Sequence, residues 1–314
     1  MAMFLLRRLA ALCLVVLATS FAVFGALYAA PGSPEQFLVQ GRSVSPEVLA
    51  SIRDQYHLDA PFLVRYVDWL GAVVRGDFGI SLGTRQDVGQ MLLDRLPTTL
   101  MLTAYAAVII VLIGVVAGAV AGLRPGWLDN VLLLGSNVGF AVPTFFAAML
   151  LMSVFGVGLG WFPVFGSGEG LPDRLWHLTL PAFALALPSM AVVARISRTA
   201  VIEERESEHA ETARSRGVPE AVVIRRHVLR NSLLPVVTAS GVQVAGLFAG
   251  AFVVEHAFSL DGIGELLVAA VQQKEFAVVQ AVTLLLVVGF GLVNLLVDVL
   301  YAVIDPRVRV GGAS

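Results

Sequence analysis

Charged residues are scarce in this sequence. Only 14% of its 314 residues are Asp, Glu, Lys or Arg, whereas 57% are hydrophobic. Soluble domains carry about 25% charged residues, so this composition excludes an ordinary water-soluble fold. The formal net charge of −2 provides no basic field that could hold phosphates, which argues against nucleic acid as a partner. The composition therefore predicts a protein that is solvated mainly by membrane lipid.

Residues that bind cofactors or carry redox chemistry are also few. The single cysteine, Cys13, lies in an apolar run and cannot form an internal disulfide. The sequence contains no C-x-x-C, no H-E-x-x-H and no G-x-x-x-x-G-K-[ST]. These absences exclude the common zinc motifs and a phosphate-binding loop. We therefore expect this chain to hold no cofactor and no metal.

Long apolar runs make up most of the remaining sequence. A bilayer core about 30 Å thick requires about 20 apolar residues per helix. Six segments meet this length: residues 9–30, 98–123, 131–157, 178–196, 233–254 and 278–304. Hydrocarbon offers no partners for backbone polar groups, so each segment is expected to be helical, including the fourth, which contains Pro181 and Pro188. The sequence thus predicts an all-α integral membrane fold with six transmembrane helices.

The distribution of arginine predicts the orientation of these helices. One face of the predicted topology holds these arginines: Arg7, Arg8, Arg124, Arg198, Arg205, Arg214, Arg216, Arg225, Arg226, Arg230, Arg307 and Arg309. Short basic segments remain on the cytoplasmic side, whereas long loops such as residues 31–97 count little in this rule. Both termini are therefore expected in the cytoplasm, with residues 305–314 as a short tail.

The first apolar segment has an alternative interpretation as a cleaved signal peptide. It follows a basic start, and Ala29-Ala30 resembles a cleavage site. The apolar part of a signal peptide is about 7–15 residues long, and this run is longer. Its length favours a retained anchor, so residues 1–30 are expected to form an N-terminal transmembrane helix.

The large loop of residues 31–97 is expected to be extracytoplasmic and helical. Ser45-Pro46-Glu47 is typical of a helix start, with a capping hydroxyl before a proline. Apolar residues then recur at helical spacing: Phe62, Leu63, Tyr66, Val67, Trp69, Leu70 and Val73. This pattern predicts an amphipathic helix that could lie on the bilayer surface. Two roles remain open, a cap that only packs on the spans or a docking platform for a soluble partner.

Asp298 is the one ionisable residue clearly within a predicted span, and it follows Asn294 by one helical turn. Such residues are costly in lipid and often functional. The pair could line a translocation pathway, or it could hydrogen-bond neighbouring helices, which is the interpretation we favour. A proton-coupled carrier would need several such residues, and an intramembrane protease would need a catalytic pair. Neither is evident.

A polar excursion, residues 199–231, separates the fourth and fifth spans. Residues 200–216 are helix-compatible, with a narrow apolar strip formed by Val201, Ile202, Ala210 and Ala213. Gly217 suits the position after a helix end, and Pro219 suits the start of a second helix that reaches about Arg230. In that second helix one set of apolar residues lies opposite Arg225, Arg226 and Arg230: Ala221, Val222, Ile224, Val228 and Leu229. A solvated loop is the simpler interpretation, but the spaced apolar residues favour a bent docking element.

Four residues of this excursion keep the spacing of a known motif: Glu211, Ala213, Gly217 and Leu229. The segment resembles the EAA loop of ABC-importer permeases. Thr212, His227 and Arg230 depart from the general pattern, but they resemble the version found in dipeptide, oligopeptide and nickel permeases.

Other motifs of that branch occur in order along nearly the whole chain. They are Gly76-Asp77-Phe78-Gly79-Ile80-Ser81, Leu96-Pro97-Thr98-Thr99-Leu100, Glu255-His256-Ala257-Phe258, Gly262-Ile263-Gly264, Asn294-Leu295-Leu296-Val297-Asp298 and Asp305-Pro306-Arg307. Asp261 replaces a usual proline, and Lys274-Glu275 replaces a usual Arg-Asp. We expect these departures to affect partner docking or gating rather than the fold.

The resemblance implies a type I importer permease with a MetI-like fold, a non-catalytic subunit that forms the translocation pathway for peptides. It implies four kinds of partner: a homologous second permease, two cytoplasmic P-loop ATPases that bind ATP-Mg, an extracytoplasmic substrate-binding protein and membrane lipid. The residues expected at the ATPase contact are Glu211, Ala213, Arg214, Gly217, His227, Leu229 and Asn231. A nickel or other small-solute importer of the same family is the main alternative. A stand-alone secondary transporter and an intramembrane enzyme fit the sequence less well.

Overall fold

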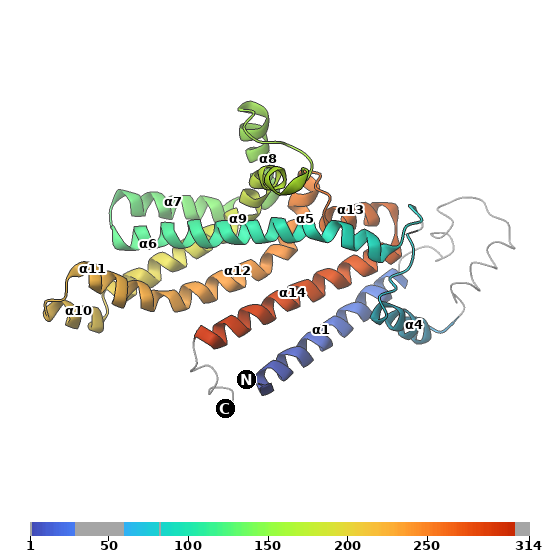
Figure 1. Ribbon diagram of the computed structural model, residues 1–314, viewed down its shortest axis with the longest axis horizontal. Coiled ribbons are helices and arrows are strands. Elements are labelled where there is room, and N and C mark those ends of the chain that lie inside the picture. The colour runs from blue at the N-terminus through green and yellow to red at the C-terminus, as the bar shows by residue number, and fades with distance from the viewer. Residues whose placement is uncertain (1, 29–59, 82, 305–314) are drawn as a thin grey trace. The chain divides into compact units, whose positions relative to one another are not determined.

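The apolar segments of the chain are helical, as the membrane requires. The computed structural model describes residues 2–28, 60–81 and 83–304, and within this part no strand is formed beyond one isolated bridge, Ile80 with Asp87. Three sequence predictions lie outside the described residues: the helix start at Ser45-Pro46-Glu47, the cleavage-like Ala29-Ala30 and the C-terminal segment from Asp305 to Ser314. The predicted all-helical class is confirmed for the described part (Figure 1).

Among the described residues, five helical stretches are long and apolar enough to cross a membrane, or up to six if a bent pair counts as one span. The first two are Leu6–Ala26, within α1 (Ala2–Tyr28), and Val88–Leu123, which combines α5 (Val88–Ile109), η1 (Ile110–Val115) and α6 (Val116–Leu123). The others are α9 (Gly170–Arg205), Glu220–Ala257, which combines α11 (Glu220–Val222), η3 (Val223–Val228) and α12 (Leu229–Ala257), and Phe276–Val297 within α14 (Phe276–Ile304).

The predicted third span, residues 131–157, is not one straight helix. It consists of α7 (Trp127–Ala141) and α8 (Thr144–Leu151), and α8 continues into η2 (Met152–Gly158). The two halves meet at an angle of 108°. Pro143 explains the bend, because proline lacks a backbone donor and forces the preceding residue, Val142, into extended geometry with φ −77° and ψ 119°.

The second and fourth spans are longer than predicted. The second begins at Val88 rather than at residue 98, because Asp87 caps the helix start. Its Oδ1 accepts the Gln90 N–H at 2.9 Å. The fourth runs unbroken from Gly170 to Arg205 through Pro181 and Pro188.

The chain divides into two compact units. The larger unit contains Thr98–Gly262 and Gly289–Ser314, and the smaller contains Ala2–Pro97 and Ile263–Val288. In the larger unit α9 is central, since it packs against α6, α7, α8, α12 and η1 (Figure 1). The core of this unit is formed mainly by residues of α5, η1, α9 and α12.

Three glycines allow the close approach of α9 to the end of the second span. They recur every four residues, at Gly114, Gly118 and Gly122. A Cβ on Gly118 would lie only 2.2 Å from the carbonyl oxygen of Ala194 in α9. This small-residue contact is typical of helix packing in membranes, and it fixes α6 beside α9.

The smaller unit contains α1, α4 (Phe62–Val74), the start of α5, α13 (Ile263–Gln273) and the start of α14. An apolar cluster joins α5, α13 and α14. Buried Glu275 accepts a hydrogen bond from the N–H of Gly83, in the loop that precedes α5. One of the residues that depart from the family pattern therefore holds this loop in place. The predicted amphipathic helix is confirmed as α4, which packs on α1.

Candidate functional site

The polar excursion folds as a helical hairpin at the end of α9. The predicted helix of residues 200–216 is wrong as a single element, because α9 ends at Arg205 and α10 (Glu208–Ser215) begins after a break. Ser207 explains the break. Its hydroxyl donates to the Glu204 carbonyl oxygen at 2.6 Å, and its own carbonyl oxygen accepts the Ala210 N–H at 3.1 Å.

Gly217 ends α10 in the geometry that its position predicts. Its φ is +76°, in the left-handed region where only glycine avoids a steric cost. The Gly217 N–H donates to the Arg214 carbonyl oxygen at 2.9 Å, and the Val218 N–H donates to the Ala213 carbonyl oxygen at 3.1 Å. These two bonds form a Schellman motif, which turns the chain sharply and satisfies the last carbonyl groups of α10.

The second arm of the hairpin is not a short helix. It begins after Pro219 as α11, passes through η3 and continues as α12 to Ala257, with no break at Pro235. The hairpin is therefore covalently continuous with the fifth span. The segment η3 is π-helical, a form found mainly as single turns at functional sites.

Small and branched apolar side chains fill the interior of the hairpin. The buried cluster consists of Val201, Ala210, Ala213, Val223 and Val228, and Val218 and Leu229 pack against it. Of the apolar residues expected opposite the arginines of this arm, Ala221 and Val222 are exposed, whereas Val223, which was not among them, is fully buried. The wide turn of η3 explains the shift, because residues five apart, such as Val223 and Val228, share a face in a π-helix.

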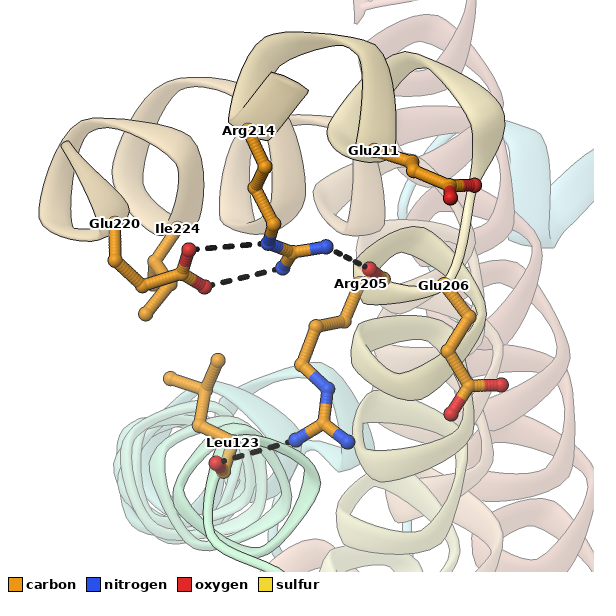
Figure 2. Close-up of a pocket in the computed structure, with 7 residues that line it drawn as sticks. All are labelled: Leu123, Arg205, Glu206, Glu211, Arg214, Glu220 and Ile224. Carbon is orange, nitrogen blue, oxygen red and sulfur yellow. Dashed lines mark hydrogen bonds and ion pairs between the residues drawn. The ribbon is translucent and has the colours of Figure 1, made fainter. Parts of the chain in front are cut away.

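An arginine brace, made of Arg205, Arg214 and Glu220, fixes the hairpin to the ends of two spans (Figure 2). Arg214 binds Glu220 in a bidentate pair, with Nε to Oε2 and Nη2 to Oε1 both 3.0 Å. Its Nη1 also donates to the carbonyl oxygen of Arg205, the last residue of α9, at 2.9 Å. The hydrogen bond with Glu220 raises the pKa of the Arg214 guanidinium above its ordinary value, so this group stays charged.

The guanidinium of Arg205 extends the brace to α6. Its Nη1 lies 3.4 Å from the carbonyl oxygens of both Gly122 and Leu123, at the end of that helix. Cations near a helix C-terminus satisfy orphan carbonyl groups and favour the helix dipole. Both arginines thus cap the C-terminal end of a helix, and the brace links α6, α9, α10 and α11 in series.

A hollow of about 790 Å³ opens between the brace and α6 (Figure 2). Its lining residues are Leu123, Arg205, Glu206, Glu211, Arg214, Glu220 and Ile224. Of the predicted contact residues, Glu211 and Arg214 line it. Glu211 is exposed, and its carboxylate lies on the opposite side of Arg214 from Glu220 (Figure 2).

The predicted contact residues His227 and Asn231 lie beside His209, which was not among the predicted contact residues. The Asn231 Nδ2 lies 3.0 Å from the His209 Nε2, which is also 3.1 Å from Ser207 Oγ and 3.1 Å from Glu204 Oε2. The rings of His209 and His227 are 6.4 Å apart. This polar cluster ties α10 to the start of α12, and no spacing rule in the sequence would have indicated His209.

Arg198 lies beyond the end predicted for the fourth span, residue 196, but in the structure it is part of α9. It forms a bidentate pair with Asp129 near the start of α7, with Nη2 to Oδ2 at 2.7 Å. The pair joins the two helices on one side of the larger unit. Its sequence signal is weak, because the two residues lie far apart along the chain.

Two further carboxylates bear on the earlier predictions. Glu255 lies one residue beyond the predicted fifth span but belongs to α12. It is fully buried and accepts a hydrogen bond from Thr99 Oγ1 at 2.6 Å.

The side chain of Asp298 lies outside the described residues. Asn294 donates to the Phe290 carbonyl oxygen of its own helix at 2.9 Å, a bond that supports neither a pathway nor an interhelical contact.

The fold and the site together define a multi-spanning α-helical membrane subunit with a braced hairpin at the end of its spans. Residues 114–310 match the model of the family described as binding-protein-dependent transport system inner membrane component, and residues 1–103 match the model of that component's N-terminal part. The chain is 36% identical over 307 residues to the glutathione transport system permease protein GsiC of Salmonella typhimurium (strain LT2) and of Escherichia coli (strain K12). Each alignment covers 98% of both proteins. The chain therefore belongs to the family of binding-protein-dependent transport system inner membrane components.

A solved structure supports the fold independently. One chain of the MetNI methionine ABC transporter, in inward-facing conformations, matches with a TM-score of 0.54 at 16% identity, over 69% of this chain and 97% of that chain. The predicted MetI-like permease fold is confirmed. The protein is thus a multi-pass inner-membrane permease of the ATP-binding-cassette type, a non-catalytic transport subunit whose family works with ATPases and binding proteins.

Proposed function

We propose that this chain forms part of the translocation pathway for small peptides and that an ATPase subunit drives it through the hairpin of residues 206–228. The arginine brace is the observation that supports this role. It connects α10 and α11 to the ends of α6 and α9, while η3 continues directly into α12. A push on the hairpin therefore reaches three membrane helices through a short hydrogen-bonded and covalent path.

The chain needs such a contact because it has no phosphate-binding loop of its own. In the complete importer we expect two P-loop ATPases, a homologous second permease and an extracytoplasmic binding protein. Glu211, Thr212 and Arg216 are exposed on α10 and its end and would meet the ATPase directly. Ala213 is buried and Leu229 is half-buried, so they would act by shaping the hairpin.

We place both termini and the hairpin in the cytoplasm. The basic loop after α6 and the hairpin lie at the same end of the larger unit, as the contact of Arg205 with Leu123 requires. Concentration of arginine at one end of a bundle is typical of its cytoplasmic side.

A small peptide is the substrate class that we propose. Residues 227–231 resemble dipeptide, oligopeptide and nickel permeases, which leaves peptide and nickel as candidates. The relatives named for glutathione transport favour the peptide, since glutathione is itself a tripeptide. Uptake into vesicles that contain the chain with its cognate subunits and binding protein would test this. We expect ATP-dependent accumulation of a labelled dipeptide or of glutathione, and uptake of Ni²⁺ alone would overturn the assignment.

Cross-linking would test the ATPase contact separately from the substrate. In a Cys13→Ala background, Thr212→Cys places a single thiol on the exposed face of α10. We expect this thiol to cross-link to the ATPase subunit, with a yield that changes when ATP is added. Asp68→Cys on α4 is the matched control and should give no cross-link. Equal yields at both positions would contradict the proposed contact.

A further inference from the structure

One face of α4 packs on α1 through aromatic side chains. Phe62 and Tyr66 contact both Phe21 and Phe24, with ring centroids 5.2 to 5.6 Å apart, and Trp69 also contacts Phe24 at 5.5 Å. In Figure 1, α4 lies beside the C-terminal end of α1. The contact therefore fixes where α4 lies along the length of this membrane helix.

The depth of that contact follows from a pair of hydrogen-bonding groups. The Tyr66 hydroxyl lies 2.8 Å from Ser20 Oγ and 3.3 Å from the Leu17 carbonyl oxygen. The apolar span of α1 is Leu6–Ala26. Ser20 therefore lies about 9 Å before the end of this span, at about 1.5 Å of rise per residue. The partner of α4 is thus the last third of the span itself, not a segment beyond it.

A second apolar stripe on α4 is exposed. Its members are Leu63, Val67 and Val74, which are 63%, 63% and 79% exposed. At 3.6 residues per turn this stripe is rotated by about 100° from the aromatic face. The remaining sector carries Arg65, Asp68 and the C-cap residue Arg75, with Val64, 48% exposed, among them.

We propose that α4 lies within the membrane interface, with Leu63, Val67 and Val74 against the acyl chains of the leaflet that surrounds the C-terminal end of α1. Leu63 and Val67 follow Phe62 and Tyr66, which contact Phe21, and the side chain of Phe21 is itself exposed on an apolar span. Interfacial helices bury an apolar face by about 5–10 Å and turn their charged face to water, and Tyr and Trp are enriched at that level. All three features occur in α4.

A soluble docking partner fits this geometry less well. Such a partner would require the stripe to stand in water, whereas the contact of Tyr66 with Ser20 holds the helix beside hydrocarbon. At α4 this geometry joins two expectations from the sequence, packing on a span and a position at the bilayer surface, and it does not support the docking platform. The helix packs on a span and uses its free side to bind lipid.

Spin labelling would test the lipid contact directly. The full chain, with Cys13→Ala, is purified in its own transport assembly and reconstituted in phosphatidylcholine and phosphatidylglycerol vesicles. Nitroxides are attached at Val67→Cys on the stripe, at Asp68→Cys on the polar sector and at Leu14→Cys as a lipid-facing reference in α1. Collisions with oxygen, which concentrates among acyl chains, are compared with collisions with a water-soluble nickel chelate.

We expect the ratio of oxygen to nickel collisions at position 67 to be several-fold higher than at position 68. It should stay below the ratio at position 14, which lies about 10 Å deeper along α1 than Phe21 at about 1.5 Å of rise per residue. A ratio at 67 equal to that at 68 would place the stripe in water and overturn the proposal. Shielding of 67 from both reagents would show that protein covers the stripe and would overturn it equally. Leu63→Cys provides a second stripe position in case the label at 67 detaches the helix.

Discussion

Two short helices outside the long spans, α10 in the larger unit and α4 in the smaller, show opposite ways of attaching an amphipathic element. The hairpin that contains α10 buries small side chains, with Ala210 fully enclosed, and it is held by the arginine brace. By contrast, α4 is held by aromatic rings around Tyr66, and it exposes aliphatic side chains such as Val67.

The difference indicates what each helix contacts. The brace and the Schellman turn at Gly217 set the shape of the hairpin from within the chain, and its outer surface is charged, as a protein partner in water requires. A preformed shape loses little entropy on binding and transmits force. The attachment of α4 has few polar bonds and an apolar outer stripe, which suits an anchor in lipid.

Substitution of Gly217 by proline should have the largest effect on the hairpin and none on α4. Proline cannot adopt φ +76° and has no N–H to donate to the Arg214 carbonyl oxygen. Proline in an incompatible position costs about 3 kcal/mol or more. We expect Gly217→Pro to abolish ATP-driven uptake while the protein still inserts in the membrane, as measured by vesicle uptake and by membrane yield.

Gly217→Ala and Gly246→Ala form the matched control pair. An added Cβ meets nothing within 4 Å at either glycine, but only Gly217 has a positive φ. Gly217→Ala should therefore cost about 1–2 kcal/mol of hairpin stability, whereas Gly246→Ala should be neutral or slightly favourable. Equal loss of coupling in both variants would mean that the turn geometry is not what matters.

A larger side chain should destabilise α10 but not α4, with an effect smaller than that of Gly217→Pro. Ala210 is fully buried, and leucine in its place overpacks the hairpin at a cost of about 1–3 kcal/mol. On α4, Val67→Leu adds a methylene to an exposed stripe and should change stability by less than about 0.5 kcal/mol. ATP-dependent uptake measures the first change, and label mobility at Asp68→Cys measures the second.

Both positions are apolar and helical, but Ala210 is buried and gains three carbon atoms, whereas Val67 is exposed and gains one. If Val67→Leu were as harmful as Ala210→Leu, the stripe of α4 would have to be packed against protein. That result would remove the contrast on which the lipid assignment rests.

Replacing Arg214 by lysine should loosen the hairpin to a smaller degree. Lysine keeps the charge but cannot bind Glu220 through two bonds and the Arg205 carbonyl oxygen at once. We expect backbone amides of residues 208–218 to exchange with deuterium several-fold faster, and ATP hydrolysis to become less tightly coupled to uptake. Arg225→Lys, at an exposed position of η3 that makes no part of the brace, should leave both measurements unchanged.

Much of this architecture follows from the sequence because local rules decide it. Lipid requires helices wherever apolar runs are long enough. Gly217 lacks the Cβ that would make its φ of +76° costly. The face of α4 that carries Tyr66 and Trp69 also follows from simple helical periodicity.

Other features depend on packing that no local pattern records. The helix breaks at Pro143 but continues through Pro181 and Pro188, which lie in a helix packed against several others. Pairs such as Asp129 with Arg198 join residues whose separation along the chain gives no hint of contact. The inward register of η3 could not be predicted either, because a π-helical turn shifts it by one residue.

Removal of the Tyr66 hydroxyl should have the smallest effect and test how α4 is attached. Tyr66→Phe keeps the ring contacts with Phe21 and Phe24 but loses the hydroxyl contacts with Ser20 and Leu17, a loss of about 1 kcal/mol or less. Tyr66→Leu also loses the edge-to-face ring contacts, so it should release α4 at a lower temperature, as reported by the mobility of a label at Asp68→Cys. If Tyr66→Phe released the helix as readily as Tyr66→Leu, polar bonds rather than aromatic packing would hold α4, and its attachment would resemble that of the hairpin after all.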